Sequence, residues 1–166
     1  MKKLLTTTLL LCASSTAAYA DGLVGGVGLT RLSLENAGID IGMNALQGTV
    51  GYQMDFDGFS LTPEFRLGTG IQDAEFGGVN FDIKNYYGVN LRAAMEVGNV
   101  YGFISPSYTH YKLGGSAAGS NFDGSNGDLG VGVGAGYRFS GNLSAEASYE
   151  WINDVDIVGV GLRLTF

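Results

Sequence analysis

Residues 155–166 read VDIVGVGLRLTF and alternate, from Val158 onward, between two kinds of side chain. One parity is entirely apolar and consists of Val158, Val160, Leu162, Leu164 and Phe166. The other parity carries glycine, threonine and one arginine, Arg163. Because side chains alternate between two faces along a β-strand, this period of two predicts a strand with one apolar and one polar face.

The same alternation occurs in five segments upstream, which are residues 46–56, 59–67, 87–97, 129–139 and 143–151. Residues 23–34 and 100–113 complete a set of eight predicted strands, although the register of these two is ambiguous. In the first, Arg31 followed by Leu32 indicates a β-bulge. In the second, two registers stay open, since the apolar face carries either Val100 and Ile104 or Tyr101 and Phe103.

The connections between the predicted strands alternate in length. Three are tight hairpin turns with residues that tolerate positive φ, namely Asp57-Gly58, Gly98-Asn99 and Ser140-Gly141-Asn142. The connections at the other end are longer, polar and rich in Gly, Asn and Ser, at residues 35–44, 72–80 and 114–126; only the one around Asn153 is short. This asymmetry is typical of outer-membrane β-barrels, with the short turns and both chain termini in the periplasm.

Composition favours a membrane barrel over a soluble β-sandwich, the main alternative. Mean hydropathy is +0.15 and 15% of residues are charged, yet no apolar run after the N-terminus is long enough for a transmembrane helix. A sandwich would expose Lys and Glu, whereas the polar face here mixes Gly, Ser and Thr with balanced charges. The sequence therefore predicts an all-β fold, an eight-stranded antiparallel up-and-down transmembrane β-barrel in the outer membrane.

Residues 1–20 have the pattern of a cleaved secretion signal. Lys2 and Lys3 precede an apolar run, and Ala18 and Ala20 supply the small residues that signal peptidase recognises. We expect residues 21–166 to form the barrel domain without a disulfide, because the only cysteine, Cys12, is removed. Acidic residues outnumber basic ones, 16 against 9, which argues against a nucleic-acid partner.

The polar face of the predicted barrel carries four acids and four bases, which are Glu64, Glu96, Glu146, Glu150, Arg66, Arg92, Arg138 and Arg163. An eight-stranded barrel is just wide enough for side chains to fill, and a charge inside it must be paired or hydrated. We therefore predict an internal ion-pair network at the periplasmic end, with Glu146 between Arg138 and Arg163 of the neighbouring strands. The network serves either as a structural plug or as part of a gated ion path.

One strip of the predicted inner wall has no side chains, because Gly130, Gly132, Gly134 and Gly136 all face inward. Two interpretations stay open. Bulky side chains from opposite strands, such as Tyr86 or Arg92, fill the strip. Otherwise, a narrow water-filled cleft remains there.

The residues indicate neither catalysis nor a cofactor or metal site. His110 is the only histidine, and Ser105 and Ser107 have the opposite strand parity, so they point to the other side of the wall. Carboxylates gather in the predicted outer loops, namely Glu35, Asp40, Asp73, Glu75, Asp123, Asp128, Asp154 and Asp156. They either bind divalent cations that bridge to anionic lipopolysaccharide or are simply solvated.

Together these features resemble the small eight-stranded outer-membrane barrels of Gram-negative bacteria, the OmpA/OmpX type and the opacity-related porin-like proteins. The resemblance covers residues 21–166, and its most specific part is the ending GVGLRLTF, residues 159–166. It implies a monomeric barrel without cofactor, inserted by the barrel assembly machinery. That machinery would recognise the terminal strand through Val160, Leu162, Leu164 and Phe166.

The resemblance further implies contact with outer-membrane lipid and lipopolysaccharide, and either a role in membrane integrity or contact with a host surface ligand. The sequence favours such a structural or surface-interaction barrel. A small low-conductance channel is the alternative. An outer-membrane lipid-modifying enzyme is the most distant possibility, because His110 and Ser107 differ in parity.

Overall fold

The computed structural model describes residues 22–36, 39–72, 74–76, 79–117, 120–153 and 155–166. The predicted signal peptide, with Ala18 and Ala20, lies outside these ranges. The described chain forms ten strands, which are β1 (Leu23–Asn36), β2 (Ile39–Tyr52), β3 (Met54–Phe56), β4 (Phe59–Gln72), β5 (Ala74–Phe76), β6 (Val79–Val97), β7 (Val100–Ala117), β8 (Ser120–Arg138), β9 (Leu143–Ile152) and β10 (Val155–Thr165). Among the described residues there is no helix long and apolar enough to cross a membrane.

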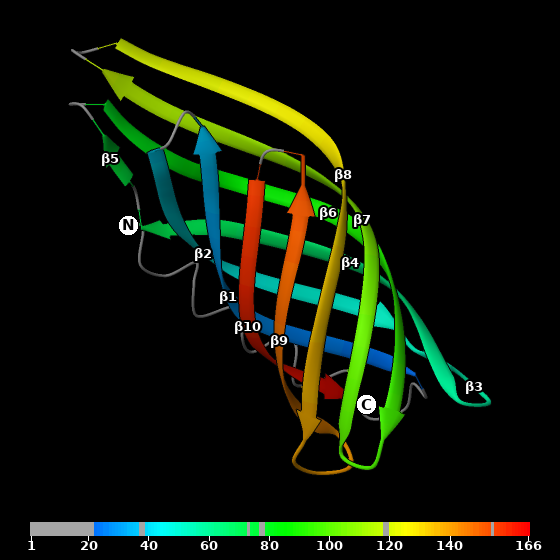
Figure 1. Cartoon of the computed structure of the whole chain (residues 1–166). Helices are drawn as coiled ribbons and strands as arrows, with labels where there is room; N and C mark the ends of the chain where they lie inside the picture. The colour runs from blue at the N-terminus through cyan, green and yellow to red at the C-terminus, as the bar shows by residue number, and fades with distance from the viewer. Residues whose placement is uncertain (1–21, 37–38, 73, 77–78, 118–119, 154) are drawn as a thin grey trace, which may run out of the picture.

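All of these strands belong to one antiparallel sheet that closes on itself (Figure 1). The order around the ring is β4, β2, β1, β10, β9, β8, β7 and β6, and the pairing of β4 with β6 completes it. The short β3 continues the line of β2 after Gln53, and β5 continues the line of β4. The predicted eight-stranded up-and-down barrel is therefore confirmed.

The two ends of the barrel differ. At one end, which we call the terminal end, Val24 pairs with Thr165, so the first strand begins where the last one finishes. The three predicted tight turns lie at this end, and Gly58 and Gly98 have the positive φ angles, 87° and 65°, that such turns need. The opposite end is the distal end, where the hairpin of β7 and β8 projects beyond the wall (Figure 1).

The prediction of long loops at the distal end was wrong. β1 and β2 continue their pairing as far as Asn36 and Ile39, and β7 and β8 as far as Ala117 and Ser120. The Gly, Asn and Ser content of these segments suggested loops because such residues are depleted in strands. Strand propensity depends on context, however, and a hairpin already in register extends by adding ladder hydrogen bonds.

The predicted bulge in the first strand was also wrong. β1 pairs with both β2 and β10 without any shift of register past Arg31 and Leu32. Leu32 is buried inside the barrel, and Arg31 is exposed on the outer face. The sequence suggested a bulge because a cation interrupts an apolar face; the structure keeps the register and places that cation outside.

The open register of the 100–113 segment is settled by burial. Val100 and Ile104 are exposed on the outer face, and Tyr101 is buried. Phe103 lies inside with Tyr101, since both rings contact inward-facing glycines of β8. Bulges occur instead beside Asn44, where β2 meets β4, and between Ile83 and Asn85 in β6.

The distribution of apolar and charged side chains is the reverse of that in a soluble protein. Val160 is 58% exposed and Leu162 is 50% exposed, whereas Arg66 and Glu150 are each only 7% exposed. An apolar outer wall around a polar interior requires an apolar medium outside. This arrangement excludes the soluble sandwich.

Candidate functional site: a charged chamber inside the barrel

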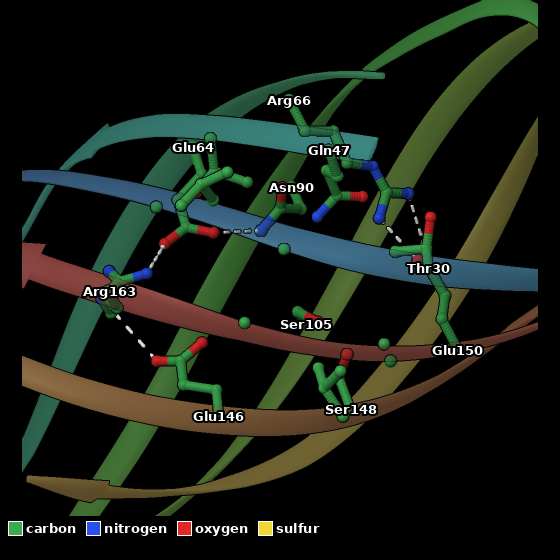
Figure 2. A pocket seen from close by; sticks show the side chains of 18 of the residues that line it. Thr30, Gln47, Glu64, Arg66, Asn90, Ser105, Glu146, Ser148, Glu150 and Arg163 are labelled. Atoms are coloured by element: carbon green, nitrogen blue, oxygen red, sulfur yellow. Dashed lines mark hydrogen bonds and ion pairs between the residues drawn. The ribbon is translucent and has the colours of Figure 1, made fainter. Parts of the chain in front are cut away.

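The terminal half and middle of the barrel enclose a polar chamber of about 100 Å³ (Figure 2). Its charged walls are built by Glu64 and Arg66 of β4, Arg92 of β6, Glu146 and Glu150 of β9, and Arg163 of β10. Its open space comes from inward-facing glycines that take no room, which are Gly26, Gly28, Gly132, Gly159 and Gly161. Because glycine has no side chain, these positions keep the chamber hollow.

Arg66 and Glu150 form the deepest ion pair. The guanidinium donates two hydrogen bonds to the carboxylate, at 2.5 and 2.6 Å. Arg66 also donates to the Thr109 hydroxyl, and Ser107 donates to Glu150 at 2.5 Å. β4 and β9 are four strands apart in either direction, so this pair spans the full width of the barrel.

Arg92 and Glu146 form a second two-bond pair, with distances of 3.0 and 2.6 Å. Tyr101 donates its hydroxyl to the same carboxylate at 2.6 Å. The Arg92 guanidinium carbon lies 3.5 Å from the centroid of the Phe103 ring, close enough for a cation–π interaction. Arg92 is therefore held by a carboxylate at its tip and by an aromatic face along its plane.

Glu64 accepts hydrogen bonds from Arg163 at 2.5 Å and from Asn90 at 2.8 Å. Arg163 Nε also lies 3.9 Å from Glu146, which joins this pair to the Arg92 pair. Figure 2 shows Arg163 between the two carboxylates. Arg92, Glu146, Arg163 and Glu64 thus form one connected set. The Arg66–Glu150 pair is separate from it, and every carboxylate of the chamber has an arginine partner.

The remaining two predicted interior charges, Arg138 and Glu96, pair with each other at the terminal end. Both side chains are partly exposed, at 34% and 38%. The prediction placed Glu146 between Arg138 and Arg163 of the neighbouring strands. Its contact with Arg163 is present at 3.9 Å, but Arg138 is not its partner. In a barrel this narrow, long side chains reach across the interior, and Glu146 binds Arg92 instead.

Among the residues that the structure describes, three buried side-chain atoms around the chamber have no hydrogen-bond partner, namely Arg66 Nε, Asn90 Oδ1 and Arg163 Nη2. Water is the natural partner for such groups, and a space of about 100 Å³ holds about three molecules. The chamber is therefore not fully packed, and it has both the space and the polar groups that bound water needs.

The glycine strip of β8 combines both of its predicted interpretations. The rings of Phe103 and Tyr101 on the adjacent β7 cover Gly134 and Gly136, so a Cβ at either glycine would overlap a ring. Gly132 lines the open chamber, so this part of the strip is not filled by a side chain. Tyr86, one of the two side chains predicted to fill the strip, does not lie there, because it covers Gly68 of β4.

Beyond the Arg66–Glu150 pair, toward the distal end, the interior turns apolar. We call this group the apolar cluster; it consists of Leu32, Met43, Ala45, Ile83, Tyr86, Ile152, Val155 and Ile157. The apolar cluster was not predicted from the sequence. Its signal was present in β10, where Val155 and Ile157 are apolar residues on the inward parity.

These observations describe a lipid-facing barrel, and residues 4–165 match the family described as outer membrane protein beta-barrel domain. The chain belongs to this family. The outer-membrane barrel is also similar in fold to solved structures. Ail, the attachment invasion locus protein of Yersinia pestis, has 18% identity and a TM-score of 0.65, covering 89% of this chain and 100% of that one.

Two other structures share the fold of this outer-membrane barrel. Neisserial surface protein A has 14% identity and a TM-score of 0.62, with coverage of 88% of this chain and 98% of its own. The N-terminal β-barrel domain of Pseudomonas aeruginosa OprF has 15% identity and a TM-score of 0.56, with coverage of 85% and 97%. No curated protein sequence matches the chain.

The other predicted functional residues of this outer-membrane barrel are spread apart. His110 faces outward and packs against Tyr87, with the ring centroids 5.1 Å apart and the rings tilted by 37°, whereas Ser105 lines the chamber. Among the described residues no serine contacts the histidine, and no group of three His, Cys, Asp or Glu residues could hold a metal ion. The opposite parity of Ser107 and His110 is as expected from the sequence.

Most of the acidic positions in the predicted loops lie outside the described side chains, including Glu35, Asp40, Asp73, Glu75, Asp123 and Asp154. Asp128 is not in an outer loop but on β8, where it accepts hydrogen bonds from Tyr111 at 2.6 Å and from Asn126 at 2.8 Å. Asp156 lies on the outward parity of β10. These two carboxylates therefore do not share a site.

Three of the predicted assembly-signal residues lie on the terminal strand β10, and the fourth, Phe166, directly follows it. Val160, Leu162 and Leu164 are exposed on its outer face. The backbone N–H of Phe166 donates to the Leu23 carbonyl at 2.9 Å, which fixes the end of the chain against the first strand.

Proposed function

We propose that this outer-membrane barrel is a closed barrel with a structural or surface-contact role, rather than a channel or an enzyme. The observation that carries the proposal is the two-layer filling of the interior, with paired charges in the chamber and the apolar cluster above them. Both layers oppose the passage of ions. The acidic and basic side chains of the chamber neutralise one another, and the apolar cluster has no side-chain group that could coordinate an ion.

The energetic argument rests on dehydration. An ion that leaves the chamber toward the distal end would have to pass Leu32, Met43 and Ile152, which supply no hydrogen-bonding group. Transfer of an unpaired charge into such surroundings is strongly unfavourable. Hydrophobic constrictions of this kind close pores by excluding water.

The chemistry of the interior argues against an enzyme. Ser107 donates to Glu150, which is already bound to Arg66, so the carboxylate is committed to a structural pair. Imidazole is the usual base for such a serine, and His110 faces the opposite side of the wall.

We place the terminal end in the periplasm and the distal hairpins outside. The terminal strand, with Val160, Leu162, Leu164 and Phe166, would be the element that the barrel assembly machinery recognises. The barrel would cross the membrane as a monomer, because its outward wall is apolar on every side that the structure describes.

A host-contact role is supported by the similarity to Ail, which was solved in complex with the heparin analogue sucrose octasulfate. We do not propose a sulfated sugar as a ligand of this chain. This chain has a formal charge of −7, and a sulfated sugar needs a basic surface.

The test is to refold residues 21–166 into lipid vesicles, compare heated and unheated samples on a gel, and record current across a planar bilayer. We expect a heat-dependent shift of mobility and no steady conductance. Stable conductance steps would support the second candidate, a small channel, for which the open polar chamber is the favourable observation. The variant Glu150→Gln separates a gated ion path from a structural plug. It would change the current only if ions pass through the chamber.

A further inference from the structure

The two prolines of this chain occupy one row of the barrel wall. Pro63 of β4 pairs with Leu91 of β6. Pro106 of β7 stands opposite the same leucine, because the β6–β7 pairs directly above and below it keep one register. Both prolines are exposed on the outer wall. Since proline has no backbone N–H to donate, each of them removes a hydrogen bond from the ladder on one of its sides.

Each proline lies in a gap between two strands. β6 pairs with β7 on both sides of Leu91 and Arg92, but these two residues have no partner on β7, which carries Pro106 there. In the same way, Thr62 and Pro63 have no partner on β2 or β3, although β4 pairs with those strands on both sides of the gap. The two gaps therefore lie on the two outer edges of the β4–β6 pair.

Bulges interrupt the same two edges. One lies between Asn44 and Ala45, where β2 meets β4, and the other between Ile83 and Asn85, where β6 meets β7. Over the described residues, the ladders β2–β1, β1–β10, β10–β9, β9–β8 and β8–β7 have neither a gap nor a register shift. Irregular pairing is thus concentrated on both sides of β4 and β6.

Between these two edges, β4 and β6 hold together and face the charged chamber. Ser60–Gly68 of β4 pairs with Tyr86–Ala94 of β6 without interruption. We call these two segments the panel. Every ion pair of the chamber joins the panel to the far wall, β9 and β10, and Figure 2 shows the first two of them. The pairs are Glu64–Arg163, Arg66–Glu150 and Arg92–Glu146.

The ion pairs supply cohesion that the edges of the panel lack. The outer side of the β6–β7 gap faces lipid, since Leu91 is 45% exposed and Val89 is 54% exposed. A backbone carbonyl without a donor is unfavourable in such surroundings. Moving the panel away from the far wall would separate buried charges from their partners, which is strongly destabilising. The gaps therefore favour movement of the panel, and the ion pairs oppose it.

We propose that the panel is a moving part of the barrel wall, which separates from β2 and β7 along the two proline gaps, and that the three ion pairs of the chamber are its latch. The closed barrel of the proposed function is the latched state, and the movement is additional to it. Asn90 and Arg92 line the chamber beside the β6–β7 gap. An open panel therefore gives the chamber an entrance through the side of the barrel.

The experiment measures backbone hydrogen exchange of residues 21–166 in lipid nanodiscs, since exchange reports local opening. The amides of Val89 and Ala93 report on the β6–β7 edge, because their pairs lie on either side of the gap. Val133 is the reference, because it pairs with Ile104 in the uninterrupted β7–β8 ladder and also with β9. We expect Glu150→Gln to speed exchange at Val89 and Ala93 about tenfold and to leave Val133 unchanged.

The position of this substitution makes the test specific. Glu150 is on β9, which pairs with β8 and β10 and with neither edge of the panel. Val133 is nearer to the substituted strand along the wall than Val89 is. A faster exchange at Val89 alone can therefore arise only through the pair that crosses the barrel.

Two further variants separate the latch from general destabilisation. Pro106→Ala restores the missing N–H and should slow exchange at Val89 and Ala93 about fivefold, the effect of one ladder hydrogen bond. Gly28→Ala strains the far wall, because its Cβ would lie 2.7 Å from the Val160 carbonyl oxygen. It cuts no ion pair and should speed exchange between β1 and β10 without affecting the panel.

The proposal is overturned if Glu150→Gln speeds exchange equally at all amides or at none, or if Gly28→Ala opens the panel as Glu150→Gln does. Unchanged exchange in Pro106→Ala would also contradict it. Glu146→Gln cuts another pair of the latch and replaces Glu150→Gln if that variant does not fold. Failure of these tests would leave the proposed function untouched, because a barrel whose panel never opens is still closed, and bilayer conductance tests closure separately.

Discussion

The two halves of the barrel interior are filled by side chains of opposite polarity. The chamber is filled by long charged side chains that reach across the barrel, as Arg66 does to Glu150. The distal half is filled by apolar side chains, such as Leu32, Met43 and Tyr86, that pack against one another. The difference teaches that a polar inner face does not determine how a small barrel is packed, and that its stability depends on different forces at different depths.

The largest effect is expected where a buried charge loses its partner. Glu150→Ala leaves the Arg66 guanidinium buried without a carboxylate and should lower the free energy of unfolding by about 3–5 kcal/mol. Urea unfolding in lipid vesicles measures this change. A loss under 1 kcal/mol would mean that water in the chamber compensates Arg66 as well as Glu150 does.

A somewhat smaller effect is expected in the apolar cluster. Ile152 is 1% exposed, and Ile152→Ala should cost about 3 kcal/mol through the cavity that it leaves. Leu162→Ala on the outer wall is the matched control and should cost less, because lipid tails replace the lost contacts. Equal losses from the two variants in the same urea titration would show that the cluster is not packed as a core.

Overpacking gives the next effect. In Gly134→Ala the new methyl group would overlap the Phe103 ring, and the rearrangement should cost about 1–3 kcal/mol. Gly102→Ala is the control, because a Cβ there has only a carbonyl at 3.9 Å and faces outward. Thermal unfolding on gels compares the two, and a stable Gly134→Ala barrel would imply that Phe103 is free to move.

The smallest effect is expected for the exposed pair at the terminal end. Arg138→Gln should reduce stability by less than about 1 kcal/mol, since the Arg138–Glu96 pair is partly exposed and screened. The remaining contribution should disappear at high salt. A loss of stability as large as that of Glu150→Ala would mean that the exposed pair at the terminal end contributes as much as a buried pair of the chamber.

Part of the candidate site could be predicted from the sequence, because strand parity assigns each residue to a face. Parity placed all eight interior charges and the four glycines of β8 on the inner wall. It could not assign partners, since Glu64 and Arg163 are 99 residues apart in the chain and three strands apart around the ring. The sequence pattern also predicted a bulge at Arg31 that the structure does not have. In a sequence, a cation on an apolar face gives the same pattern as a bulge.

The sequence by itself determined the strands, their two faces and the tight turns at the terminal end, because these depend on local periodicity and on φ preferences. Only the tertiary structure decided which charges meet, where the interior changes from polar to apolar and how far the hairpins extend. The physical reason is closure. Joining β4 to β6 sets the width of the barrel, and that width brings side chains from opposite strands within reach of one another.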